Sequence, residues 1–273
     1  MIPRSRRAFL ALGGSLASAV LAGCTTPRNE VRERTTDTVD VGNATDLQVT
    51  SRNGSVTVTT WNRDAVELSV TKRSIGSRDT FDDVEVRTAV RNRSLAIEAV
   101  YTTDRARRRV ATDFELQVPS SLAVSAVETG NGRVDVTGTT GDGRFSTQNG
   151  RVTATDVDGF VTLTTSNGAL ESSGCTGVDG AKTSNGSIDL ELLDIRRDVD
   201  ISTQNGSIDV AVSGSLDADV VLAASNGSVA ADGVELANTT RTPRRITGRL
   251  GDGGNRLRLS VTNGSAELTA LDD

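Results

Sequence analysis

The residues best suited to undergo chemistry lie near the start of the chain, in the segment Leu21-Ala22-Gly23-Cys24. Small residues before a cleavage site give a signal peptidase access to the bond. The segment resembles a lipobox, in which the cysteine after that bond becomes lipidated. Arg6 and Arg7 form the arginine pair that a twin-arginine translocon reads as an export address. The sequence therefore predicts an exported lipoprotein with its lipid on Cys24.

The segment between these two motifs must be a signal peptide or a membrane anchor. Residues 8 to 22 are mostly apolar, but about 15 residues are fewer than the ~20 that a membrane-spanning helix needs. We therefore interpret residues 1 to 23 as a twin-arginine lipoprotein signal peptide. Residues 24 to 44 are rich in Thr, Arg, Asp and Glu and have too few apolar side chains to fold, so we expect a flexible tether. This arrangement predicts a protein held at the outer face of the cell membrane.

Catalytic and metal-binding chemistry have few candidates in the rest of the chain. There is no histidine, which removes the usual general base and the commonest transition-metal ligand. Cys175 lies in a turn and has no disulfide partner if Cys24 is lipidated. We therefore expect no catalytic residues, no cofactor and no bound metal.

Three aspartates recur four residues after a repeated asparagine, at Asp135, Asp189 and Asp209. We expect them to point outward, with Asp189 and Asp209 on one exposed ladder. Two carboxylates at a fixed separation are also what a polysaccharide lyase or glycosidase needs. A carbohydrate-active enzyme therefore stays open as an alternative to a protein without enzymatic activity.

The charge balance limits the partners of the protein. The chain has 36 acidic and 30 basic residues and a formal net charge of −6, and loss of a signal peptide with three arginines and no acid takes it to −9. Lysine occurs only at Lys72 and Lys182. An aspartate-rich, lysine-poor surface is similar to that of halophilic archaea, where net negative charge keeps a protein soluble in strong salt. Biased codon usage in a GC-rich genome would produce part of the same pattern. The acidic surface argues against nucleic acid as a partner, since phosphate binding requires a basic face.

Two clusters of arginine interrupt this acidic background. The first runs from Arg105 to Arg109, and the second consists of Arg241, Arg244, Arg245 and Arg249. Each either binds an anionic glycan or lipid headgroup or offsets the surrounding acids, and the sequence leaves both interpretations open.

Eight N-glycosylation sequons occur, and five of them belong to a repeated Asn-Gly-Ser turn. Turn chemistry already explains those five. We therefore expect the possible acceptors to be Asn43, Asn92 and Asn238.

An Asn-Gly pair recurs through most of the chain with similar surroundings, as expected of a repeat protein. From Asn131 the spacings are 18, 18, 18, 20, 21 and 37 residues, the last being about two periods. Apolar positions alternate on both sides of each pair, which is the pattern of a half-buried strand. The pairs are Asn53-Gly54, Asn131-Gly132, Asn149-Gly150, Asn167-Gly168, Asn185-Gly186, Asn205-Gly206, Asn226-Gly227 and Asn263-Gly264.

These features predict an all-β fold, a parallel β-solenoid (β-helix) with two strands in each coil of 18 to 21 residues. Asn-Gly also closes β-hairpins, so an antiparallel meander is the alternative. Residues 64 to 119 lack the Asn-Gly period but still alternate, so we expect a more antiparallel cap at the N-terminal end. Such a cap would protect the exposed edge of the stack.

The repeat also has a family resemblance. The Ser/Thr-x-Asn-Gly-x-Val/Ile-x-Val units and the step Leu116-Gln117-Val118-Pro119 resemble the putative-adhesin β-strand repeat family, a domain of unknown function, over about residues 45 to 270. The resemblance implies a β-helical cell-surface domain with an adhesive role and no established active site. We therefore expect an adhesive, scaffolding or envelope-associated role, with surface glycans or other envelope proteins as partners. An envelope-sensing domain is a further alternative.

Overall fold

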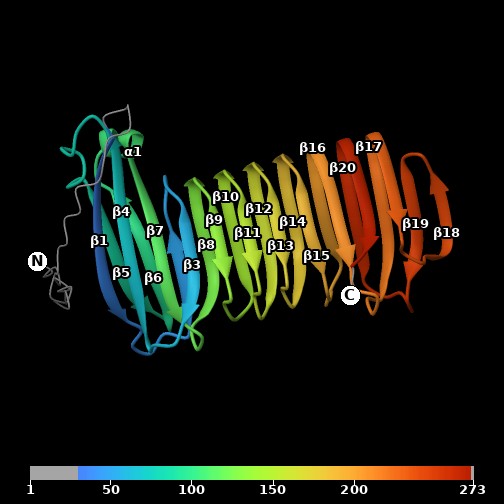
Figure 1. The fold of residues 1–273 in the computed structure, drawn as a ribbon, viewed down its shortest axis with the longest axis horizontal. Coiled ribbons are helices and arrows are strands. Elements are labelled where there is room, and N and C mark those ends of the chain that lie inside the picture. Colours follow the sequence, from blue (N-terminus) through green and yellow to red (C-terminus); the bar gives the residue numbers. More distant parts are fainter. Residues whose placement is uncertain (1–29, 272–273) are drawn as a thin grey trace, which may run out of the picture.

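The computed structural model describes residues 30–271 and is almost entirely β-sheet, with twenty strands and one short helix (Figure 1). The expected all-β class is confirmed. The sheet is mixed: parallel pairing dominates the repeats, whereas antiparallel pairing occurs at both ends. No helix within residues 30–271 is long and apolar enough to cross a membrane.

The middle of the molecule is a stack of repeats. One strand of each repeat leads into the Asn-Gly corner and a second strand leaves it. Each strand pairs in parallel and in register with the equivalent strand of the next repeat, so that Asn149 lies opposite both Asn131 and Asn167. These strands are β8 (Ala123–Asn131), β9 (Val134–Thr137), β10 (Gly143–Asn149), β11 (Val152–Thr155), β12 (Phe160–Asn167), β13 (Leu170–Ser173), β14 (Gly177–Asn185) and β15 (Ile188–Leu192).

At the C-terminal end, three strands run through the corner without interruption: β16 (Val199–Val212), β17 (Ala218–Asp232) and β20 (Arg256–Ala270). The last of these, β20, inserts between the other two and is parallel to both. The hairpin of β18 (Ala237–Thr242) and β19 (Arg245–Leu250) adds antiparallel strands to the outer side of β17. The interpretation of the 37-residue spacing as two successive periods is therefore wrong, because this interval holds a hairpin and a return of the chain.

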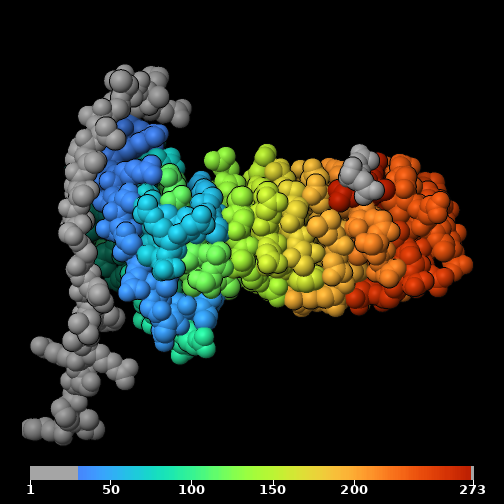
Figure 2. Space-filling model, turned by 60° about the horizontal axis from the view of Figure 1, so that its bottom comes forward, coloured from blue at the N-terminus to red at the C-terminus, as the bar shows by residue number. Residues whose placement is uncertain are grey.

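The N-terminal end is broader than the stack (Figure 2). One coil of the repeat, β2 (Asp46–Thr50) and β3 (Val56–Trp61), pairs in parallel with β8 and β9. Beyond β3, the strands β7, β4 and β1 follow one another, with antiparallel pairing of β4 to both neighbours. Beyond β2 lies an antiparallel hairpin of β6 and β5. Their bounds are β1 (Glu30–Asp40), β4 (Ala65–Ile75), β5 (Val84–Arg91), β6 (Ser94–Tyr101) and β7 (Val110–Pro119), with helix α1 (Asp104–Arg109) before β7.

The tether predicted for residues 24 to 44 is wrong for residues 30 to 40, which form strand β1. This strand pairs with β4 over its whole length, from Glu30 opposite Ile75 to Asp40 opposite Ala65. Most of its side chains are exposed, so the sequence lacks an apolar signal. Backbone pairing with β4 and the packing of Val31 and Val39 against the core stabilise it instead.

The core lies between the strands that enter the corners and the strands that leave them. Inward residues of successive repeats form columns, such as Phe145 between Val127 and Leu163. Aliphatic side chains fill this narrow space to 0% exposure in most repeats. The stack thus places all Asn-Gly corners along one edge of the molecule and the other turns along the opposite edge.

Candidate functional site: the asparagine ladder and its flanks

The eight corner asparagines form one continuous hydrogen-bonded column, which we call the asparagine ladder. Each amide Nδ2 donates to Oδ1 of the asparagine in the preceding coil, as Asn167 does to Asn149 at 2.8 Å and Asn185 does to Asn167 at 2.8 Å. In spatial order the ladder runs Asn53, Asn131, Asn149, Asn167, Asn185, Asn205, Asn263 and Asn226, with donor–acceptor distances of 2.7 to 3.1 Å. The repeat therefore selects asparagine for its side chain, which can donate and accept at once.

The glycine after each asparagine is fixed by backbone geometry. Gly168 has a φ of +153°, and a Cβ at this position would lie 1.9 Å from the carbonyl oxygen of Gly150. The same close approach recurs at the other corners, so each glycine admits the backbone of its neighbouring coil. Only the glycine of each pair adopts positive φ. In the hairpin turn that Asn-Gly commonly forms, both central residues have positive φ.

A buried threonine two residues before the asparagine holds the corner from inside. Thr165 is 3% exposed, and its hydroxyl donates to the carbonyl oxygen of Gly150 at 3.1 Å. Thr129, Thr147, Thr183 and Thr203 make the equivalent bond. Each threonine thereby supplies a hydrogen bond that the corner carbonyl would otherwise lack in the protein interior.

The two ends of the ladder differ. At the first end, Nδ2 of Asn53 donates to the carbonyl oxygen of Arg107 in α1 at 2.7 Å, so the helix closes the ladder. At the other end, Asn226 donates to Asn263 at 3.1 Å. Within residues 30–271 no side chain donates to Asn226 in turn, so the last acceptor faces outward.

The structure places two of the three outward aspartates next to each other, as expected. Asp189 and Asp209 are neighbours in one exposed column, and Glu171 and Glu267 extend it on either side. Asp135 lies in the same column but is separated from Glu171 by Thr153. These carboxylates lie on a strand face, and neither concavity described below contains them. Among residues 30–271 no group of three His, Cys, Asp or Glu side chains is placed to hold a metal ion.

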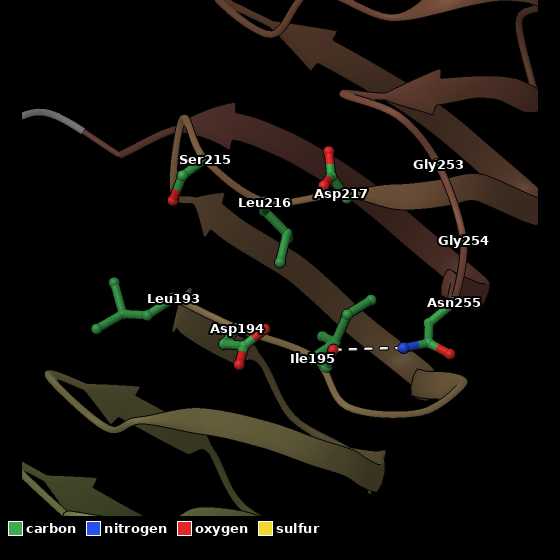
Figure 3. Close-up of a pocket in the computed structure, with 9 residues that line it drawn as sticks. All are labelled: Leu193, Asp194, Ile195, Ser215, Leu216, Asp217, Gly253, Gly254 and Asn255. Atoms are coloured by element: carbon green, nitrogen blue, oxygen red, sulfur yellow. Dashed lines mark hydrogen bonds between the residues drawn. The ribbon is translucent and has the colours of Figure 1, made fainter.

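One concavity lies at the edge opposite the ladder. It is bounded by the loop after β15, the loop before β17 and the loop before β20 (Figure 3). Its lining contains two carboxylates, Asp194 and Asp217, which lie on two different loops (Figure 3). Asp217 accepts the backbone N–H of Asp252 at 2.7 Å, and Asn255 donates to the carbonyl oxygen of Ile195 at 3.4 Å. The polar groups here stabilise crossing loops, and they do not form the facing acid pair that glycoside hydrolysis requires.

The same opposite edge carries a charge network centred on Arg196. Its guanidinium bonds Asp142 at 2.7 Å and Asp179 at 2.6 Å, and it lies 4.2 Å from the centre of the Phe160 ring. The pKa of Asp142 is lowered, first by the backbone N–H of Phe160 and also by Arg196. This network links four successive repeats near the turn opposite the Asn-Gly corner.

A second concavity, of about 610 Å³, lies at the first end of the ladder. Four exposed arginines surround it: Arg52 before the first corner, and Arg107, Arg108 and Arg109 of α1. The sequence pointed to the cluster from Arg105 to Arg109 but not to Arg52, because only the pairing of β3 with β7, the strand that follows α1, brings the first corner to the helix. The structure thus joins two basic segments that lie about 55 residues apart in the chain.

Cys175 is fully buried, and its thiol contacts the carbonyl oxygens of Ala154 and Ser173 at 3.6 Å. Burial raises the pKa of this thiol. An uncharged, inaccessible thiol is a poor nucleophile, which agrees with a packing role in a turn.

The other predicted site residues divide into two groups. Arg6, Arg7 and Cys24 lie outside the described residues. Asn43 and Asn92 lie in exposed turns, and Asn238 lies on the exposed strand β18. Their side chains are accessible, whereas the amide nitrogens of the ladder asparagines are occupied as donors.

Comparison with known proteins identifies the family of the chain. The model of the Toastrack DUF4097 family matches residues 26–269. A putative cell adhesion protein from Clostridium sporogenes ATCC 15579 is 12% identical, covering 88% of this chain and 100% of that chain, with a TM-score of 0.39. A putative adhesin from Bacteroides fragilis NCTC 9343 is 13% identical, covering 88% and 97%, with a TM-score of 0.36. No curated protein matches the chain. The family match spans nearly the whole described region, and the chain belongs to the Toastrack DUF4097 family.

Proposed function

We propose that this protein is a lipid-tethered β-solenoid on the outer face of the cell membrane, with an adhesive, scaffolding or envelope-associated role and no enzymatic activity. An extended, rigid surface of the protein contacts its partners. The observation that carries this proposal is the asparagine ladder, which runs unbroken through eight coils from Asn53 to Asn226.

The ladder favours this function because it rigidifies the corner edge without creating a pocket. Exposed polar columns flank it, and the two concavities contain no converging catalytic groups. A flat, repetitive polar surface suits contact with an extended glycan or with another envelope protein. Parallel stacking of coils, closed by antiparallel strands at both ends, supports the solenoid assignment.

The tether is the second part of the proposal. Cys24 lies six residues before β1, so a lipid there would hold the folded body close to the membrane. The arginine pair at Arg6 and Arg7 supports export through the twin-arginine pathway. The bias toward aspartate and away from lysine supports an origin in a halophilic archaeon.

The test compares the native protein with a Cys24→Ser variant in the organism that produces it. Intact mass, membrane fractionation and labelling by a reagent that does not cross membranes are measured on both. We expect the native protein to carry a lipid mass, sediment with membranes and be labelled from outside. We expect the variant to lack the lipid mass. The proposal would be overturned if the native protein were unmodified, stayed in the soluble fraction and were not labelled by the external reagent.

An Arg6→Lys/Arg7→Lys variant serves as the control for the export route. We expect it to remain inside the cell at full length, with no lipid on Cys24. Processing at the native level would show that another pathway exports the protein.

A further inference from the structure

The arginines at the first end of the ladder have few partners within the protein. Arg107 pairs with Asp104 at 3.3 Å, in a contact where the two side chains are 50% and 75% exposed. Within residues 30–271 no carboxylate oxygen lies within 4 Å of the guanidinium groups of Arg52, Arg108 or Arg109. In a chain with an excess of acids, three exposed cations without acidic partners are available to an external anion.

The acids nearest this patch already have partners within the protein: Asp104 pairs with Arg107, Asp113 and Glu30 pair with Arg73, and Asp83 accepts from the hydroxyl of Thr103. Among all eight Asn-Gly corners, the residues on either side of the pair include Arg52, Arg133 and Arg151 but no acid. The nearby loop after β4 does contain Asp79 and Asp82 beside Arg78, so we leave Arg78 out of the patch. The acids of the repeats lie in the strand-face column described above and in the turns of the opposite edge, such as Asp142, Asp156, Asp158 and Asp194.

The chain enters the folded body beside the same patch. Glu30, the first residue of β1, lies opposite Ile75, and the preceding residue of β4, Ser74, lies opposite Val110. Val110 directly follows Arg109, so the start of β1 and the end of α1 lie at one edge, the upper one in Figure 1. Cys24 is six positions before Glu30 in the sequence, a length of chain that spans at most about 20 Å.

An exposed apolar side chain completes this edge. Ile75 is 68% exposed, more than Val90 at 39% or Leu193 at 36%, the other large apolar side chains exposed in the described part of the chain. Ile75 is one residue beyond the pair Ser74–Val110, at the end of β4 nearest to α1, and its partner on β1 is Glu30. An exposed aliphatic side chain at the same edge as several cations is typical of a surface that contacts lipid headgroups.

We propose that Arg52, Arg107, Arg108, Arg109 and Ile75 form a surface that binds the anionic headgroups of the membrane to which the protein is tethered. The inference rests on the proposed tether for its biological setting. A basic patch adds a second attachment to a lipid anchor and fixes the orientation of the folded body on the membrane. Guanidinium groups bind headgroup phosphates through charge-assisted, two-point hydrogen bonds. Contact at this edge would direct the acidic turns of the repeats away from the membrane.

The test measures sedimentation of a chain of residues 25–273 with vesicles, because this chain contains every described strand and no lipid. Vesicles of phosphatidylglycerol mixed with phosphatidylcholine are compared with phosphatidylcholine alone. We expect binding to the anionic vesicles only. Changing Arg107, Arg108 and Arg109 to Gln should weaken it roughly 100-fold, the loss expected when three arginines no longer act near an anionic surface.

Two controls distinguish binding through this patch from a general effect of positive charge. Changing Arg245, Arg249 and Arg256 to Gln removes the same charge at the far end of the stack, and it should change binding less than about threefold. Changing Arg107, Arg108 and Arg109 to Lys should retain most of the binding. Thermal unfolding of each variant shows that it is folded.

The contribution of the apolar side chain is tested at high NaCl, where charge interactions are screened. Ile75→Ser should weaken binding there, whereas Val90→Ser should not.

Equal loss in both Gln variants, or equal binding to neutral and anionic vesicles, would overturn the proposal. So would binding to a carboxylated polysaccharide such as alginate with no binding to anionic vesicles, because the patch would then be a glycan site. These results do not depend on lipidation of Cys24, so failure of the tether and failure of the patch are distinguishable.

Discussion

Asn205 and Asn263 are ladder neighbours although 58 residues separate them, with Nδ2 of Asn263 donating to Oδ1 of Asn205 at 2.9 Å. The next corner in the chain, Asn226, lies on the far side of Asn263 and donates to it. The last coil of the chain is therefore not the last coil of the stack. The inserted strand β20 has a partner on each side and joins the C-terminal hairpin to the repeats.

Cysteine cross-linking tests this strand order. Ser260 lies opposite Ser202 on one side and opposite Ala223 on the other. Ser202→Cys/Ser260→Cys and Ala223→Cys/Ser260→Cys should oxidise to disulfides, because neighbouring strands lie about 4.8 Å apart. Ser202→Cys/Ala223→Cys should not, since two strand spacings exceed disulfide reach. Non-reducing electrophoresis of the chain without Cys24 reports the result, and a bond between residues 202 and 223 would contradict the order.

The corner glycines predict a large effect from a single methyl group. Gly168→Ala places a Cβ against the carbonyl oxygen of Gly150 and forces positive φ on alanine. The free energy of unfolding should therefore fall by at least about 3 kcal/mol. Gly214→Ala is the matched control, because a Cβ there meets no atom within 4 Å. It should change stability by less than about 0.5 kcal/mol in urea denaturation. Similar values for both variants would show that the coils separate easily.

The ladder predicts a difference between its middle and its end. Asn167 makes two ladder bonds, and Asn226 makes one. Asn167→Ala should cost about 1 to 2 kcal/mol of unfolding free energy and Asn226→Ala about half as much, because each exchanges protein hydrogen bonds for water. Chemical denaturation measures both. A larger loss at Asn226 would argue that the ladder bonds contribute little to stability.

Acid should loosen the network at the opposite edge. The pKa of Asp142 is lower in the folded state than its ordinary value of 3.8, so its charged form stabilises the fold above that value. This contribution is lost as pH falls below about 4 and through the lowered folded-state pKa. Asp142→Asn should therefore lower the melting temperature at pH 7 and make it less sensitive to acid below pH 4. Asp156→Asn, at an exposed turn in the next repeat, is the control. Parallel pH curves for native protein and Asp142→Asn would contradict the assignment.

The sequence by itself determined the repeat and its strands. The period of the Asn-Gly pair and the alternation of apolar residues are local signals, so they identified the corners, the inward positions and the column that holds Asp189 and Asp209. They did not separate a threonine that bonds a carbonyl inside the corner from a threonine that faces water, because both alternate in the same way. They also attributed asparagine to turn conformation, although its side chain makes the ladder.

Tertiary structure alone decided which coils are neighbours. Identical corners can stack in any order, and the order was set by pairing over long separations: β2 with β8, β1 with β4, and β20 between β16 and β17. Strand β1 shows why this information is missing from the sequence. Its side chains are mostly exposed and polar, and apart from the packing of Val31 and Val39 its stability comes from backbone hydrogen bonds to β4, which nearly every residue type can make. The same long-range pairing brings Arg52 to α1 and so creates the basic patch that neither segment forms alone.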